Sequence, residues 1–100
     1  MPAFAALLLI ELHFPDAGSL KGKRKELSSL KAQLHGRLGV AVSEVGHQDL
    51  WQRSTLAAAV TGGSQAAVLD ACDRVQRFLD ARVPEGYRIE QTVVSFQELL

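Results

Sequence analysis

Basic side chains are concentrated in one stretch of this sequence, and a cluster of cations is suited to binding anions. Between Ser19 and Arg37 the only acid is Glu26, and the net charge is +5. The six basic residues there are Lys21, Lys23, Arg24, Lys25, Lys31 and Arg37. The rest of the chain carries five basic residues and ten acids, so the whole chain is neutral. The pattern indicates local attraction of an anion rather than wholesale binding of polyanions.

Four of these cations fall at the start of a predicted helix that Ser19 can cap. The helix dipole makes that end positive, so each added cation costs about 0.3–1 kcal/mol. A bound phosphate or carboxylate would reverse the sign of this penalty. At about 100° per residue Lys23 falls inside the leucine stripe of the helix, which predicts a stem on apolar surface and an ammonium beyond the sheet end. The alternative is a solvated lysine face on a surface helix.

A second polar segment is predicted to form a hairpin, and it reads Gly46, His47, Gln48, Asp49, Leu50, Trp51, Gln52, Arg53. One interpretation is a recognition loop in which Trp51 offers a stacking surface and Arg53 a phosphate fork. The structural alternative is that Asp49 forms a local turn or pairs with Arg53, while Trp51 covers the edge of the core.

Catalytic and metal chemistry find little support in the sequence. His47 with Asp49 could act as a general base, but no Ser, Thr or Cys nearby is marked as a nucleophile. The three histidines, His13, His35 and His47, lack metal-ligand spacing. The single cysteine, Cys72, lies on a predicted apolar helix stripe and excludes a disulfide framework. We therefore predict no catalytic residue, metal or cofactor, and favour a binding protein over an enzyme.

Length and composition predict one small domain over residues 1–100. The chain is 47% hydrophobic and 22% charged, as is typical of a globular protein. The apolar run Ala3–Ile10 is too short to span a bilayer and lacks the basic start of a signal peptide. We expect a cytoplasmic protein.

Hydrophobic periodicity predicts six elements. Strands are expected over residues 3–14, 38–45, 51–61 and 87–96, a first helix over 20–36, and a second helix from Ser64 to a turn at 84–86. The order β-α-β-β-α-β predicts an α+β ferredoxin-like sandwich, a four-stranded antiparallel sheet with two helices on one face. Right-handed crossovers place the two strands that precede helices in the middle.

This topology brings three connections to one end of the sheet. The basic helix start is then expected beside residues 46–53 and 83–86. The distinctive polar side chains of the chain would converge there.

The opposite face of the sheet is predicted to be apolar and uncovered. If even residues of the first strand face the helices, the outward residues include Leu7 and Leu9, with Ala57 and Ala59 on the third strand. Such a face is too apolar to be left in water, and a second copy is the simplest cover. We predict a homodimer through this face.

Two motifs carry a resemblance that covers nearly the whole chain. The segments 19–24 (SLKGKR) and 42–53 (VSEVGHQDLWQR) resemble the YlxP-like family of small bacterial proteins. The resemblance implies a ferredoxin-like fold without an established activity, and the frequent gene neighbours, a translation initiation factor and a ribosome-binding factor, imply a link to RNA. The family often has Glu at the position of Gly22 and Asn at that of Gly39, and its pattern does not require His47.

Three hypotheses for function follow. The first is a module for structured RNA or a ribosomal surface, with contacts from Lys21, Lys23, Arg24, Lys25, Trp51 and Arg53. The third strand lacks stacking aromatics, so this would not be a usual RNA-recognition motif. The second is a dimeric module that senses a small molecule or anion. The third is an acylphosphatase-like hydrolase, although the expected Gly-rich Arg loop after the first strand is missing.

Overall fold

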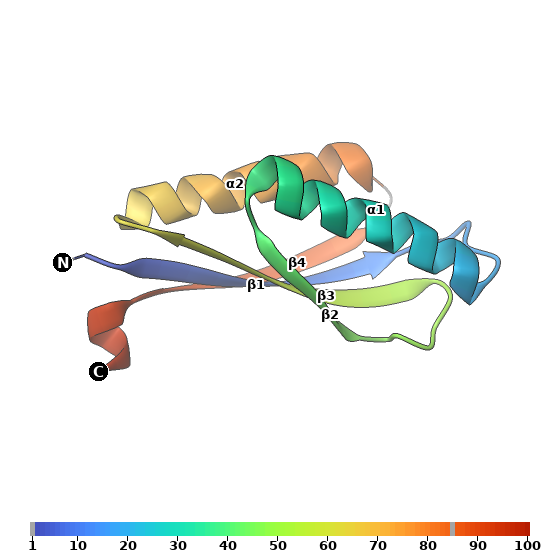
Figure 1. Ribbon diagram of the computed structural model, residues 1–100, viewed down its shortest axis with the longest axis horizontal. Coiled ribbons are helices and arrows are strands. Elements are labelled where there is room, and N and C mark those ends of the chain that lie inside the picture. The colour runs from blue at the N-terminus through green and yellow to red at the C-terminus, as the bar shows by residue number, and fades with distance from the viewer. Residues whose placement is uncertain (1, 85) are drawn as a thin grey trace.

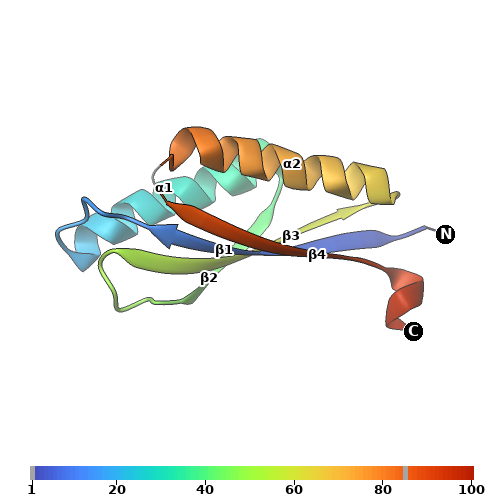
Figure 2. The same ribbon diagram turned by 180° about the vertical axis from the view of Figure 1, so that it is seen from behind.

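The computed structural model describes residues 2–84 and 86–100 and has the predicted element order. The elements are β1 (Phe4–His13), α1 (Leu20–Leu38), β2 (Ala41–Gly46), β3 (Arg53–Gly62), α2 (Gln65–Arg82), β4 (Tyr87–Ser95) and a short 3-10 helix, η1 (Phe96–Leu99). Figure 1 shows α1 and α2 together on one face of the sheet, with η1 on the other side. Figure 2 shows the same layers from behind.

The sheet is antiparallel with strand order β2-β3-β1-β4. The central strands β1 and β3 pair along their whole length, from Phe4 opposite Gly62 to His13 opposite Arg53. These are the two strands that precede helices, as predicted. The ferredoxin-like sandwich is confirmed.

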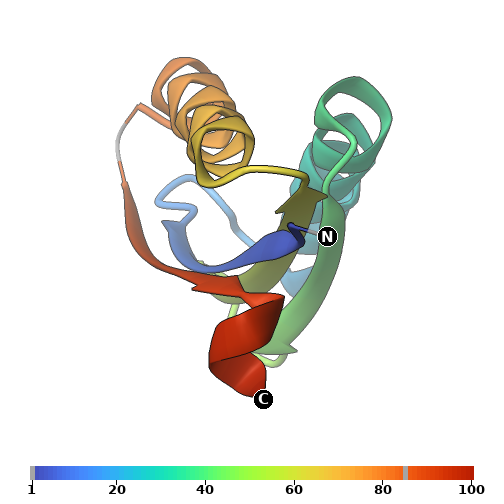
Figure 3. The same cartoon turned by 90° about the vertical axis from the view of Figure 1, so that its left-hand side faces the viewer.

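The core lies between the sheet and the two helices. Even residues of β1 such as Leu8 and Ile10 are fully buried, and the odd residues Leu7 and Leu9 are exposed on the open face. Each helix contributes one apolar stripe, made of Leu27, Leu30 and Leu34 in α1 and of Val68, Cys72, Val75 and Leu79 in α2. Seen along the strands, the helices cover only one side of the sheet (Figure 3).

Local signals set the element ends. The Ser19 side chain accepts a hydrogen bond from the Gly22 amide at 3.0 Å and begins α1 as predicted. The helix ends at Leu38 rather than Gly36, because Gly39 adopts the left-handed conformation (φ 67°) that closes a helix.

Other expected boundaries are wrong by a few residues. The strand β3 begins at Arg53 rather than near Trp51, so the hairpin loop is longer than predicted. Phe96, placed in the last strand, instead begins η1, which Ser95 caps by accepting from the Glu98 amide at 3.3 Å. Glu85, in the turn predicted at 84–86, lies outside the described residues. Among the described residues, no helix is long and apolar enough to cross a membrane.

Candidate functional site

Three connections of the chain meet at one end of the sheet, which we call the hairpin pole. The Phe14 amide donates to the Gln52 carbonyl at 2.8 Å, and the Gln52 side chain donates to the Pro15 carbonyl at 3.1 Å. The His13 amide donates to the Gly86 carbonyl at 3.0 Å. The predicted convergence of these loops is confirmed.

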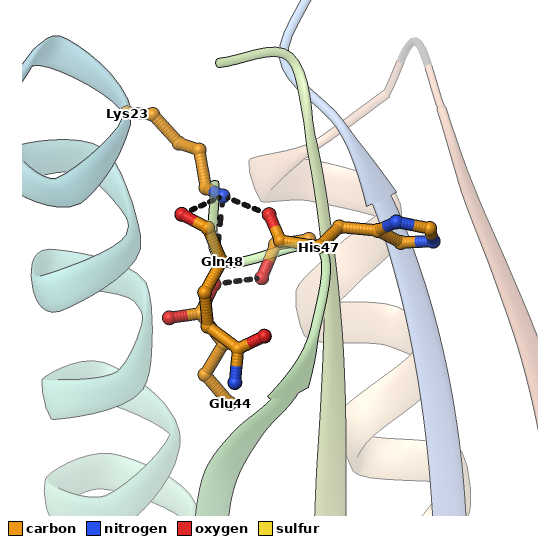
Figure 4. A network of polar contacts seen from close by, with 5 residues as sticks. Lys23, Glu44, His47 and Gln48 are labelled. Atoms are coloured by element: carbon orange, nitrogen blue, oxygen red, sulfur yellow. Dashed lines mark hydrogen bonds and ion pairs between the residues drawn. The ribbon is translucent and has the colours of Figure 1, made fainter. Parts of the chain in front are cut away.

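Lys23 ties the basic helix to the hairpin. Its side chain is fully buried, and its ammonium donates to the His47 carbonyl at 2.6 Å and to the Gln48 carbonyl at 3.4 Å. The same nitrogen lies 3.5 Å from Oε2 of Glu44, which also accepts from the Ser54 hydroxyl at 2.9 Å. Figure 4 shows Lys23 reaching from α1 into this network. A buried ammonium with several oxygen partners holds two elements in one relative position.

The network corrects the position predicted for Lys23. The stem covers apolar surface and the ammonium reaches the loop beyond β2, but it is buried among protein oxygens and not open to an external anion. Oxygens of the protein itself therefore neutralise and solvate the Lys23 ammonium, in place of the predicted external anion.

His47 serves this network through its backbone. It has a left-handed conformation (φ 59°), uncommon for a residue with a side chain, and its carbonyl accepts from both Lys23 and the Leu50 amide. Its imidazole points away from Lys23 (Figure 4). The hairpin therefore needs the carbonyl of residue 47 rather than imidazole chemistry.

The sequence contains a signal for this network. Val42 faces the helices, so strand alternation puts Glu44 on the same face, and Ser54 precedes the buried Leu56 by two residues. A lysine in the leucine stripe and an inward glutamate at the same pole predict an ion pair.

Four of the remaining cations of α1 form an exposed surface, the basic face, made of Lys21, Arg24, Lys25 and Lys31; Arg37, in the last turn, is not part of it. The first three are exposed and Lys31 is half-buried. Among residues 2–84 and 86–100 no ion pair involves any of the four. Arg24 and Lys31 line a groove of about 340 Å³ between α1 and β2, together with Leu27, Ser28, Glu44 and Gln48. Lys23 offsets the charge of Glu44 there.

Trp51 and Arg53 lie at the same pole but line a different pocket. Arg53 is opposite His13, an outward residue of β1, and both line a pocket of about 400 Å³. Trp51 lines it too and is 53% exposed, and Asp49, Leu50 and Gln52 complete the lining. No ion pair joins Asp49 to Arg53 within the described parts of the chain. The predicted composite site is thus divided between a groove beside α1 and a hairpin pocket at the open face.

Cys72 is a poor candidate for a nucleophile. Cys72 is fully buried, and burial, with a smaller effect of Asp73, raises the pKa of its thiol. The thiolate needed for nucleophilic attack is therefore disfavoured. Across the described ranges no three His, Cys, Asp or Glu side chains gather in a metal-binding group.

Fold and sequence together place the chain in a family. Residues 5–92 match the family described as "Protein of unknown function (DUF503)", so this protein belongs to the DUF503 family. The chain is also 37% identical over 78 residues to "Uncharacterized protein YlxP" of Bacillus subtilis (strain 168), a match that covers 78% of this chain and 80% of YlxP. The resemblance to YlxP-like proteins is confirmed.

Two solved structures share the architecture at low sequence identity. The de novo designed protein Foldit4 superposes with a TM-score of 0.56 at 8% identity, covering 92% of this chain and 96% of that one. A VAO-type flavoprotein from Myceliophthora thermophila C1 gives 0.58 at 14% identity, covering 97% of this chain but 17% of that one. At these identities the likeness shows the fold alone.

Proposed function

We propose that this protein binds RNA at the hairpin pole, with phosphates on the basic face and an unpaired base in the hairpin pocket. The observation that carries the proposal is the basic face itself. Its four cations lack ion-pair partners among the described residues, although the chain as a whole is neutral. Cations gathered on one element are the usual electrostatic feature of phosphate-backbone contact.

The position of the cations on α1 supports this function. The first turn contains no acid, so Lys21, Arg24 and Lys25 add to the positive end of the helix dipole. Arg24 and Lys31 are separated by two turns, about 10 Å along the helix, so they can contact different phosphates of one strand. The energetic cost of crowding these cations becomes a gain when phosphate binds.

The Lys23 network supports a binding surface that is formed before the ligand arrives. Lys23 holds the hairpin at a fixed distance from α1 through the His47 carbonyl and Glu44. A surface held in its bound shape loses less conformational entropy on binding, so affinity rises. In this view Lys23 positions the two subsites and does not contact RNA.

The hairpin pocket has the chemistry for one base and its phosphate. Trp51 offers an exposed indole, and Arg53 lies in the same pocket with its guanidinium available for a phosphate oxygen. Stacking of a base on an aromatic ring contributes about 1–3 kcal/mol. The pocket favours RNA with unpaired nucleotides over a continuous duplex.

Charge reversal on the basic face tests the phosphate contacts. The double variant Arg24→Glu with Lys25→Glu should lose nearly all affinity for a short RNA hairpin with an unpaired loop, measured by filter binding at low salt. The control, Arg74→Glu with Arg77→Glu, changes the net charge equally at exposed positions of α2 and should bind nearly as wild type does. Equal loss in both double variants would mean that net charge alone governs binding, and the proposed surface would be wrong.

The only tryptophan of the chain reports on the base contact. Titration with the same hairpin RNA should quench Trp51 fluorescence, whereas the duplex stem without its loop should quench it little. Trp51→Ala should weaken binding of the looped RNA about tenfold, by the loss of one stacking contact. RNA that binds without changing the fluorescence would exclude the hairpin pocket from the interface.

A further inference from the structure

The open face of the sheet combines exposed large residues with a strip of small ones. Leu7 and Leu9 of β1 are 59% and 41% exposed and form a ridge. Ala59 and Ala57 of β3 are their direct cross-strand neighbours and form a shallow trough beside it. The trough continues onto β2, where Ala41 is paired with Ala59.

From this arrangement we infer that a second copy of the chain packs sheet to sheet on the open face, with the leucine ridge of each copy in the alanine trough of the other. The register between β1 and β3 indicates that the partner on this face is a second copy of the chain. Because Leu7 is opposite Ala59 and Leu9 opposite Ala57, a two-fold axis along the strands between β1 and β3 places each leucine over an alanine. A large residue then meets a small one at all four positions, as close packing requires.

The polar residues in the row of Leu9 and Ala57 fit the same axis. Glu90 of β4 and Ser43 of β2 lie at opposite ends of the row that contains Leu9 and Ala57. The two-fold axis exchanges the two ends of the row, so each Glu90 faces a serine hydroxyl of the second copy. In this row no charge is placed against a like charge.

The size of the face is sufficient for a stable dimer. Three strands of nine to ten residues and the six-residue β2, about 4.8 Å apart, give roughly 550 Å² in plan per copy. The short helix η1 lies on the same side of the sheet and adds Phe96 and Leu99, which are 57% and 68% exposed (Figure 1). The total for two copies exceeds the roughly 1,000 Å² that a specific interface needs.

The dimer leaves the basic face of each copy uncovered, because α1 lies on the opposite side of the sheet (Figure 3). The axis along the strands also brings the two hairpin poles to the same end of the assembly. The hairpin pocket also lies at the open face, so the dimer borders it. The dimer test involves none of the cations of α1, so the dimer and RNA binding can fail independently.

The experiment is sedimentation velocity of the full chain at micromolar concentration. The wild type should have twice the 10.9 kDa chain mass. Leu7→Lys with Leu9→Lys should be a folded monomer by circular dichroism, because both positions are on the surface of the single chain. The control Leu69→Lys alters a leucine of similar exposure (39%) on α2 and should stay dimeric.

A further variant separates specific packing from simple hydrophobic adhesion. Ala59→Leu adds apolar area but fills the trough, so ridge-in-trough packing predicts at least a tenfold weaker dimer. Tighter association of Ala59→Leu would overturn the proposed arrangement. A wild type that is monomeric, or whose mass rises past two chains with concentration, would overturn the dimer itself.

Discussion

Lys23 shows at the scale of one residue how a charge in an apolar stripe becomes a structural contact. Its stem packs among the leucines of α1, and its ammonium reaches oxygens of β2 and the hairpin. The sequence predicted that the stem covers apolar surface, but it did not predict the oxygens that surround the ammonium. Helical periodicity gives the direction of a side chain from its own helix, whereas the partner depends on which residue of another element lies opposite.

Removing the ammonium should therefore destabilise the fold. We expect Lys23→Met to lower the free energy of unfolding by about 2–3 kcal/mol, because Glu44 and the His47 carbonyl lose their buried partner. The value is below that for a fully buried pair, since the Glu44 side chain is 20% exposed. Urea unfolding measures the change. Lys21→Met, at an exposed position, should alter stability by less than about 0.5 kcal/mol, and equal stability of the two variants would contradict the role assigned to Lys23.

Tyr87 gives a second prediction at this scale. Its hydroxyl donates to the Asp80 carboxylate, and this hydrogen bond, followed by burial and the Asp80 charge, raises the pKa of Tyr87 to about 12. The folded pKa lies above the unfolded value near 10, so the stabilisation is complete below about pH 10 and is lost as pH rises through 12. The chain has one tyrosine, so ultraviolet titration follows it alone. In Asp80→Asn the titration midpoint should fall toward 10, and an unchanged midpoint would show that Asp80 is not the cause.

At the scale of elements, two glycines at the ends of α1 have opposite roles. Gly22 is within the first turn, and a Cβ there would meet only the Ser19 hydroxyl at 3.4 Å. Gly39 has a positive φ of 67° and ends the helix. Gly22 therefore lowers the helix propensity of the first turn, whereas Gly39 is required by the positive φ of the backbone there.

Alanine substitutions should separate these roles by sign. Gly22→Ala should raise the free energy of unfolding by up to about 1 kcal/mol, as alanine replaces the weaker helix former. Gly39→Ala should lower it by about 1 kcal/mol, and this cost is backbone strain because no atom lies within 4 Å of the added Cβ. Thermal unfolding of both variants measures the shifts. Shifts of the same sign would be inconsistent with the assigned backbone roles.

Elements with a clear period were predictable from sequence, and short ones were not. The apolar stripes identified α1 and α2, and apolar runs bounded by turn residues identified the four strands. The helix η1 has only four residues, too few to show a period, and Val93, Val94 and Phe96 read as a continued strand. The Ser95 hydroxyl accepts from the Glu98 amide and caps η1, so the chain leaves β4 at this residue.

At the scale of the molecule, the topology was predictable but the division of the site was not. The order of elements sufficed to bring α1, the hairpin and the β1–α1 connection to one pole. Which side of the sheet Arg53 occupies depends on its register with His13, and a register requires coordinates or a known turn length. Convergence at one pole therefore predicts one surface for Trp51, Arg53 and the lysines, whereas the register puts Arg53 on the open face.

The salt dependence of RNA affinity tests the central claim most directly. If three to four cations of the basic face contact phosphates, the logarithm of the affinity for a looped hairpin RNA should fall linearly with that of the salt concentration, with a slope of about −3. Arg24→Glu with Lys25→Glu should reduce both the affinity and the slope, while Arg74→Glu with Arg77→Glu should keep the slope. No binding by the wild type at low salt, or an affinity that does not change with salt, would contradict an RNA-binding role for the basic face.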